Sequence, residues 1–209
     1  MDPISNLISR YPDLERIKGE IIQAAEVLTK TYSDHRKVLV CGNGGSASDS
    51  EHIVGELMKS FSLKRQIPAS FENLLNEKYP EEGGYLAEHL QGALPAISLV
   101  SQRALISAYA NDVAADMVYA QQVFGYGQAG DALIALSTSG NSKNVINAVK
   151  VAAAMDIHTI CMTNSHGGKL GQLCDVSIKV PRETTPEAQE LHLPIYHALC
   201  ELMEERFFG

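Results

Sequence analysis

The sequence has no apolar run long enough to approach a membrane span, although 45% of its 209 residues are hydrophobic. The first six residues, from Met1 to Asn6, lack the basic and apolar regions of a secretory signal peptide. We therefore expect a soluble protein without membrane association. The length favours one domain over residues 1–209, large enough to bury a substantial core.

Short paired cysteine spacings are also missing. The four cysteines are far apart in the sequence, and Cys41 and Cys161 lie in apolar runs typical of buried strands. Such cysteines are most simply free thiols packed in a core. This pattern predicts a reduced environment and therefore a cytoplasmic protein.

Basic clusters are absent as well, and the net charge is −8. A chain of this charge is a poor candidate for binding nucleic acid or an anionic membrane. If its substrate is a phosphate, local dipoles and hydroxyl groups must attract the anion against the overall field.

Short apolar runs alternate with helical patterns along most of the chain. The expected strands cover residues 37–41, 95–100, 132–136, 158–162 and 176–180, and the expected helices cover 46–60, 102–122 with a break near Asn111, 142–155, 167–172 and about 186–207. Strands of this kind form parallel sheets that helices cover on both faces. We therefore predict an α/β fold with a five-stranded parallel sheet and ligand loops at its carboxyl edge.

An amphipathic helix is expected ahead of the first strand. Residues 13–31 carry apolar side chains at helical spacing, from Leu14 to Leu28, within an N-terminal helical segment over residues 1–36. The strand–helix alternation does not require this helix. It is therefore a candidate for packing against a partner subunit.

Residues 62–93 interrupt the alternation and form an insertion rich in Lys, Glu, Pro, Gly and Tyr. Short periodic stretches predict one helix around 71–79 and another around 85–91. Loops of this length are usually functional or mobile. A segment that closes over the active site and sets substrate choice, and a loosely packed surface loop or intersubunit arm, remain equal alternatives.

The first chemical motif follows the strand at 38–41. Residues 42–45 (Gly-Asn-Gly-Gly) force a tight turn with close backbone approach, and Ser46 and Asp49 then open a helix whose free N–H groups make an anion site. His52 and Glu56 are four residues apart and share one helix face, as a metal site or an acid–base pair requires.

The second motif repeats this design after the strand at 132–136. Four hydroxyl side chains lie just before a helix, and they are Ser137, Thr138, Ser139 and Ser142. Neutral hydroxyl donors at a helix N-terminus can hold a phosphate without a lysine. An ordinary turn and helix cap is the alternative for any one of them, but their density after a strand favours an anion site.

The order of Cys-Gly-Asn-Gly-Gly-Ser-Ala, His-x-x-x-Glu and Ser-Thr-Ser-Gly-Asn-Ser, with Asn111-Asp112, Gln189-Glu-x-His192 and His197 further along, resembles the sugar isomerase (SIS) domain family. The resemblance covers nearly the whole chain apart from the insertion. Within the family, it is strongest to isomerases that interconvert sedoheptulose 7-phosphate and a manno-heptose 7-phosphate. It implies a homotetramer with active sites at subunit contacts.

The resemblance also implies roles for individual residues. It puts Asn43, Gly44 and Gly45 against the sugar, Asn111 and Asp112 in a substrate-binding pair, and Ser137, Thr138, Ser139 and Ser142 around the phosphate. Without it, Asn111-Asp112 would be interpreted as a helix stop and cap.

A metal site is implied by the same resemblance. His52, Glu56, Gln189 and His197 match the ligands of one divalent metal per subunit, usually zinc, and Gln189 also matches a substrate contact. The implied reaction is ketose–aldose isomerisation through an enediol, with Glu56 as the base and His197 as the acid partner. A zinc-bound Glu is a weaker base, so ligation and proton abstraction are either shared or sequential.

Two departures from the family pattern, Ser60 and the insertion of residues 62–93, leave other functions open. The family often has an arginine four residues after the catalytic Glu, where this chain has Ser60, and Lys64 or Arg65 is a candidate substitute. The alternatives are a non-catalytic phosphosugar-binding or regulatory protein, of the replication-initiator-associated type, and an isomerase for another sugar phosphate.

Overall fold

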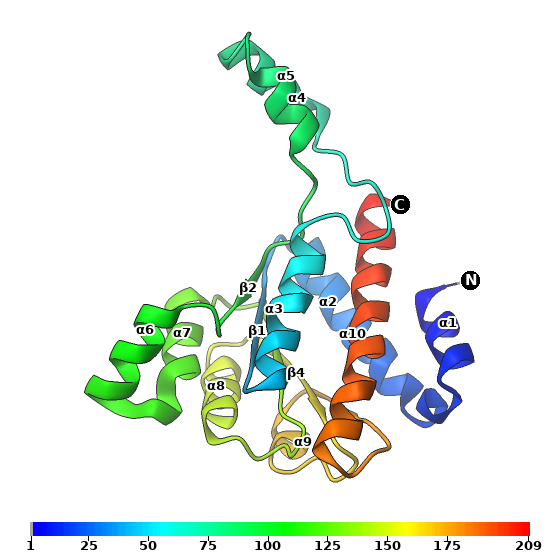
Figure 1. Ribbon diagram of the computed structural model, residues 1–209, viewed down its shortest axis with the longest axis vertical. Coiled ribbons are helices and arrows are strands. Elements are labelled where there is room, and N and C mark those ends of the chain that lie inside the picture. The colour runs from blue at the N-terminus through cyan, green and yellow to red at the C-terminus, as the bar shows by residue number, and fades with distance from the viewer. Residues whose placement is uncertain (1) are drawn as a thin grey trace.

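The computed structural model describes residues 2–209, which form one five-stranded parallel sheet with helices on both faces (Figure 1). The strand order is β2-β1-β3-β4-β5, with β1 at Val38–Gly42, β2 at Ala96–Ser98, β3 at Ala132–Leu136, β4 at His158–Thr163 and β5 at Val176–Lys179. The register pairs Val38 of β1 with Ala96 on one side and Ala132 on the other. The predicted doubly covered sheet is confirmed.

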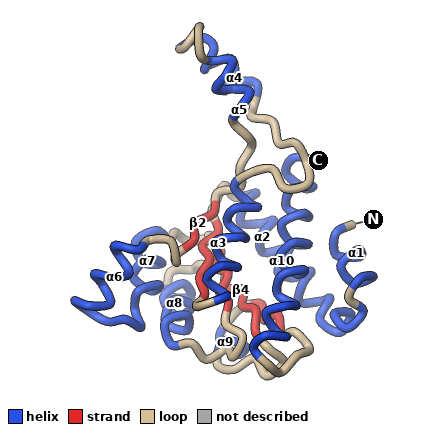
Figure 2. The backbone as a smooth tube through the Cα atoms, viewed as in Figure 1, coloured by secondary structure: helices blue, strands red, loops and turns tan. Residues whose placement is uncertain are grey.

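Alternate side chains of the buried strands face two separate cores. Val38 and Val40 pack in a cluster with α2 (Lys18–Ser33), α3 (Gly45–Met58) and α10 (Thr185–Phe208). Leu39 and Cys41 pack on the opposite face, in a cluster with α7 (Val118–Tyr126) and α8 (Lys143–Ala154). Figure 2 shows the strands between these two helical layers. Burial on both faces explains why the central strands β1 and β3 carry no charged or hydrogen-bonding side chains.

The N-terminal segment is helical, but the helix expected over residues 13–31 is divided, and a further helix precedes it. It forms α1 (Pro3–Arg10), a 3₁₀ segment (Pro12–Ile17) and then α2. The Asp2 carboxylate caps α1, because it accepts hydrogen bonds from the N–H groups of Ile4 and Ser5. An Asp directly before a Pro is a helix-start signal that could have revealed α1.

The predicted break near Asn111 is confirmed. Helix α6 (Arg103–Tyr109) continues into a π-helical turn (Ala110–Ala114) and a short 3₁₀ turn (Ala115–Met117) before α7 begins. The last short helix, α9, covers Leu170–Leu173.

The insertion forms a helical hairpin that projects away from the sheet (Figures 1 and 2). Its helices are α4 (Ala69–Lys78) and α5 (Gly83–His89), which confirms the two helices expected there. We call residues 69–89 the arm. In α4 and α5, the two helices of the arm, Gly83 is the only buried residue. At the base of the arm, the N–H of Gly92 donates to the carbonyl of Arg65 at 3.2 Å.

Within residues 2–209, no helix combines the length and the apolar character that crossing a membrane requires.

Candidate functional site

The first glycine loop brings α3 close to the start of α10. Gly44 has a φ of 56°, in the left-handed region that favours glycine. A Cβ atom at Gly45 would collide with the amide group of Gln189 as it lies here, so the glycine lets this side chain approach the loop closely. The loop at residues 43–45 and Gln189 were predicted to share a site, and the structure brings them together.

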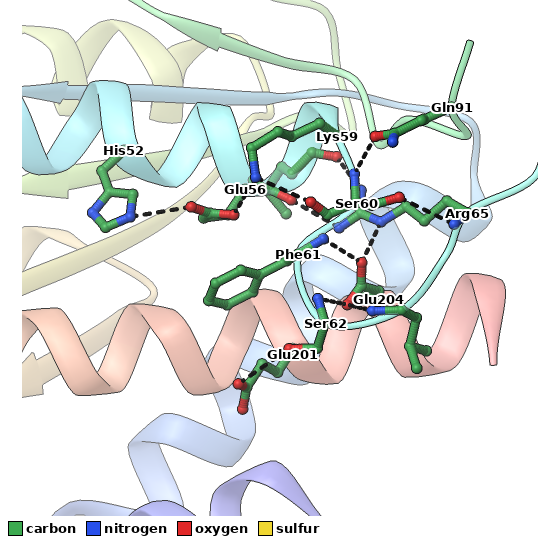
Figure 3. Close-up of polar contacts among 12 residues, drawn as sticks. His52, Glu56, Lys59, Ser60, Phe61, Ser62, Arg65, Gln91, Glu201 and Glu204 are labelled. Atoms are coloured by element: carbon green, nitrogen blue, oxygen red, sulfur yellow. Dashed lines mark hydrogen bonds and ion pairs between the residues drawn. The ribbon is translucent and has the colours of Figure 1, made fainter. Parts of the chain in front are cut away.

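Helix α3 then presents His52 and Glu56 on one face, as their spacing predicts (Figure 3). The Nε2 atom of His52 lies 3.2 Å from Oε1 of Glu56. The ammonium of Lys59 donates to Oε2 of the same carboxylate at 3.0 Å. Glu56 is 8% exposed, so its carboxylate lies between a histidine and a cation at the edge of the core.

Asp49 and Tyr196 connect this pair to Gln189. The Tyr196 hydroxyl lies 3.0 Å from Nδ1 of His52 and 3.3 Å from Oδ1 of Asp49. The Gln189 amide donates to Oδ2 of Asp49 at 3.2 Å. Burial raises the pKa of the Asp49 carboxyl, although the hydrogen bonds from Gln189 and Tyr196 oppose this effect. Sequence reasoning missed Tyr196, because nothing local distinguishes it from a core aromatic.

His197 completes the cluster from α10. Its ring lies 5.0 Å from that of His52, measured between centroids, and 5.3 Å from the ring of Phe61. Its Nε2 atom is buried without a hydrogen-bond partner among the described residues. Burial and the neighbouring His52 lower the pKa of His197 below its ordinary value. The structure therefore places three of the four predicted metal ligands, His52, Glu56 and His197, side by side.

The donor types in this cluster suit zinc, which binds imidazole nitrogens and carboxylate oxygens. An orphaned nitrogen on His197 beside the His52–Glu56 pair is the kind of polar atom that a metal would satisfy. In the described conformation, however, Gln189 bonds to Asp49, and no group of three or more His, Cys, Asp or Glu residues within 2–209 is arranged to hold an ion. The donor atoms of His52, Glu56 and His197 are of the kinds that zinc binds, and a four-ligand site that includes Gln189 stays a prediction.

The second loop lies next to the first because β1 and β3 are neighbours in the sheet. Asn43 and Asn144 exchange two amide hydrogen bonds, of 2.8 and 2.9 Å, across the two loops. Ser137 and Ser142 lie 3.0 Å apart between their hydroxyl oxygens. Asn144 was not predicted. The loop at residues 43–45 and the hydroxyl-rich loop at 137–142 therefore border one site at the carboxyl edge of the sheet.

The other two hydroxyl residues of this loop make local contacts. Thr138 donates a long hydrogen bond of 3.4 Å to Thr185, and the hydroxyl of Ser139 accepts from the N–H of Asn141 at 3.2 Å. Gly140 has a φ of 64° and packs against the Gly167–Gly168 turn so closely that a Cβ atom would collide with it. This packing fixes the shape of the loop ahead of α8.

Asn111 and Asp112 lie in the exposed π-helical turn. The Asn111 amide donates to the Asp112 carboxylate at 2.8 Å. Within residues 2–209, no hydrogen bond joins this pair to the other predicted site residues. Its role in substrate binding therefore stays a prediction.

Arg65 is not the free cation that was considered as a substitute for the family arginine. Its guanidinium is fully buried, bonds to Glu204 at 2.7 Å, and donates to the carbonyls of Glu56 and Leu57 at the end of α3 (Figure 3). Arg65 therefore stabilises the backbone that carries Glu56, and the cation at the Glu56 carboxylate is Lys59.

His192, the last residue of the Gln189-Glu-x-His192 motif, lies in the interior of the protein and not at its surface. Its side chain is fully buried, with Nε2 3.4 Å from the carbonyl oxygen of Thr163. Burial lowers the pKa of His192 to about 4.

Comparison with known proteins identifies the class of protein that this fold and site define. The profile of the SIS domain matches residues 4–72 and 74–164, so the chain belongs to the SIS domain family.

Curated relatives narrow this membership to the phosphoheptose isomerases. The phosphoheptose isomerase of Akkermansia muciniphila is 31% identical over 99% of this chain and 95% of its own length, and that of Rhodospirillum rubrum is 36% identical over 88% and 85%. The structure of phosphoheptose isomerase from Neisseria gonorrhoeae superimposes with a TM-score of 0.72, at 33% identity, covering 94% of this chain and 93% of that one.

Proposed function

We propose that the protein interconverts sedoheptulose 7-phosphate and D-glycero-D-manno-heptose 7-phosphate. The observation that carries this proposal is the Glu56 carboxylate held between His52 and Lys59, beside His197. Full-length similarity to phosphoheptose isomerases supports the substrate class.

In this reaction Glu56 is the base. Its carboxylate removes the proton from the carbon beside the ketose carbonyl while His197, the acid partner, protonates the carbonyl oxygen, which gives an enediol. The Glu56 carboxyl then returns its proton to the neighbouring carbon, and His197 takes the proton of the other enediol hydroxyl, which forms the aldose. Burial and the neighbouring His52 lower the pKa of His197, which favours the neutral imidazole, a form with one N–H donor and one acceptor nitrogen.

The two loops at the carboxyl edge bind the substrate in this proposal. The N-terminus of α8 and the hydroxyls of Ser137, Thr138, Ser139 and Ser142 hold the phosphate. Asn43, Gly44 and Gly45 hold the sugar, with the Asn43–Asn144 bridge fixing the distance between the two loops. Asn111 and Asp112 bind the substrate in this proposal when the substrate lies against the exposed π-helical turn that carries them.

We also propose one divalent metal per subunit, preferably zinc. His52, Glu56 and His197 would hold it, and Gln189 would join them by releasing Asp49. When bound, such an ion supplies electrophilic stabilisation of negative charge on the carbonyl and diol oxygens.

Assembly as a homotetramer in the cytoplasm is part of the proposal. His197 lines an open cavity of about 130 Å³ between α1 and α10, which Leu7, Arg10, Glu190 and Glu201 also line. A neighbouring subunit can therefore approach the site from this side.

The test is incubation of the protein with sedoheptulose 7-phosphate and a panel of other ketose phosphates, with chelator and with added zinc. Turnover of sedoheptulose 7-phosphate is expected, and Glu56→Gln should abolish it while phosphate-dependent binding persists. Retained activity in that variant would rule out Glu56 as the base. Binding without turnover of any sugar would support the non-catalytic alternative.

A further inference from the structure

We propose that Cys161 and Cys174 form a redox-sensitive pair, which a hydroperoxide converts to a disulfide, and that this bond weakens phosphate binding at the loop of residues 137–142. The disulfide does not depend on the proposed isomerase activity. Its effect on phosphate binding rests on the proposed function, which assigns the phosphate to this loop.

The fold brings the two thiols together. Cys161 is buried in the middle of β4, and its register partner in β5 is Ser177. The Sγ atom of Cys161 lies 3.3 Å from the Ser177 hydroxyl oxygen. Cys174 ends α9, and its side chain packs against the core cluster that contains Cys161. The two thiols are hydrogen-bonded to each other.

Backbone contacts hold Cys174 in this position. Its N–H donates to the carbonyl of Leu170 at 3.1 Å. The next residue, Asp175, accepts hydrogen bonds from the N–H and the hydroxyl of Thr159 in β4, at 2.7 and 2.9 Å. The N–H of Asp175 donates to the same hydroxyl at 2.9 Å. The end of α9 is therefore fixed against β4, and the two sulfurs stay in contact in the folded protein.

The surroundings of the pair favour a reaction between its members. Cys174 is half-buried and Cys161 is fully buried, so an oxidant reaches Cys174 first. The hydrogen bond from Cys174 lowers the pKa of Cys161, and Ser177 and Lys179 act in the same direction, whereas burial opposes them. Ionisation belongs to the pair, because the proton between the two sulfurs can lie on either one.

The reaction with hydrogen peroxide has two steps. The Cys174 thiolate attacks one peroxide oxygen, the O–O bond breaks, and a sulfenic acid forms as hydroxide leaves. The Cys161 sulfur then attacks the Cys174 sulfur, the S–O bond breaks and the S–S bond forms. In total, two thiols lose two electrons and two protons, and the peroxide becomes two waters. Cys41 and Cys200 stay thiols, because both are fully buried and burial raises the pKa of each.

The segment between the two cysteines supports the loop at 137–142. The N–H of Asn164 donates to the carbonyl of Thr138 at 2.7 Å, and the N–H of Leu170 donates to the carbonyl of Gly140 at 3.0 Å. These bonds lie between β4 and the end of α9, so both belong to the part of the chain that the disulfide would close into a ring.

Disulfide formation moves this support. An S–S bond is about 2.05 Å long, which is shorter than the separation of two hydrogen-bonded thiols. Cys161 is held by strands on both sides of β4, so Cys174 makes the larger movement. Leu170 begins the same four-residue helix and moves with it. The hydrogen bond from Leu170 to Gly140 therefore weakens, and the loop at 137–142 loses part of its support.

Peptide mass mapping of the wild type after treatment with hydrogen peroxide tests the disulfide. We expect one bond, between Cys161 and Cys174, which dithiothreitol reverses. Cys200→Ala is the matched control and should form the same bond, whereas Cys174→Ser should form none. Oxidation of either thiol to a sulfinic acid without the disulfide, or a disulfide between two copies of the chain, would overturn the proposal.

Two further measurements test the effect on the loop. Hydrogen exchange at the Leu170 N–H should be faster in the oxidised protein than in the reduced one. Affinity for inorganic phosphate, measured by calorimetry, should fall by about 2- to 10-fold on oxidation, the effect of losing one hydrogen bond, and should not fall in Cys174→Ser. A disulfide that leaves both values unchanged would refute the link to the loop. If the reduced wild type does not bind phosphate, the proposed function fails, and exchange at Leu170 decides this inference.

Discussion

Glu204→Gln is expected to destabilise the protein strongly, because Glu204 is the buried anion that organises the loop after α3. Its side chain is fully buried on α10. It accepts hydrogen bonds from the N–H groups of Phe61, Ser62 and Leu63 at 2.7, 2.6 and 2.8 Å, and from Nε of Arg65 at 2.7 Å. Figure 3 shows Glu204 beside Phe61, Ser62 and Arg65 of this loop.

The expected magnitude follows from the charge that the substitution leaves behind. The amide of glutamine would leave the fully buried Arg65 without a counter-ion, and its NH₂ group would face N–H donors. Breaking a buried ion pair by removing one partner costs about 3–5 kcal/mol. Carbonyl contacts from Glu56 and Leu57 to Arg65 remain, so the lower half of this range is expected. That loss is a large share of a typical stability of about 5–15 kcal/mol.

Urea unfolding of the wild type and the variant measures this difference. Glu201→Gln is the matched control, because Glu201 lies on the same helix and its side chain makes, within residues 2–209, only a 3.5 Å hydrogen bond with the Ser62 hydroxyl. This control should change the free energy of unfolding by no more than about 0.5 kcal/mol, as ordinary surface substitutions do. A loss below about 1 kcal/mol in Glu204→Gln, with an unchanged slope, would refute the reasoning.

Three further results are expected. Burial alone would raise the pKa of Glu204, but its hydrogen bonds outweigh this effect and hold the pKa below its ordinary value. The free energy of unfolding should therefore fall as the pH drops below about 4.3. In urea titrations, Glu204→Gln should show a smaller fall over this pH range than the wild type. His192 is buried in its neutral form with a pKa of about 4, so folding opposes its protonation. The free energy of unfolding of the wild type should therefore fall by up to about 3 kcal/mol between pH 6.5 and pH 4. Urea unfolding of His192→Phe should not show this fall. Replacing residues 69–89 by a short glycine linker should leave the thermal transition of the body intact but change the relative kcat/KM values for ketose phosphates, and unchanged values would mean that the arm does not set substrate choice.

The sheet and its two loops could be predicted because their signals are local. Apolar runs gave the five strands, and the glycine loop at 42–45 and the hydroxyl cluster at 137–142 each follow a strand directly. Adjacent parallel strands carry their loops to one edge, which is why Asn43 meets the second loop.

The resemblance predicted that His52 and Glu56 meet Gln189 and His197, but the contacts of Tyr196 and Arg65 could not be predicted, because they join residues about 140 positions apart. Tyr196 contacts Asp49 and His52 only because α3 and α10 pack side by side, and the same packing buries Arg65 against Glu204. In the sequence, a tyrosine in a helix and an arginine in a charged insertion have no feature that reveals these roles. The roles of Tyr196 and Arg65 depend on the tertiary packing of the helices.

The base of the arm, between Arg65 and Gly92, is a suitable place to replace the arm by another segment. The chain leaves the body at Arg65 and returns at Gly92, whose N–H bonds to the Arg65 carbonyl at 3.2 Å. Gly92 also packs against the Phe208 ring so tightly that a side chain there would collide with it. Because the cost of closing a loop grows only slowly with its length, segments of very different size can be accommodated between these two fixed points. A folded reporter domain with adjacent termini should therefore replace the arm without disturbing the sheet.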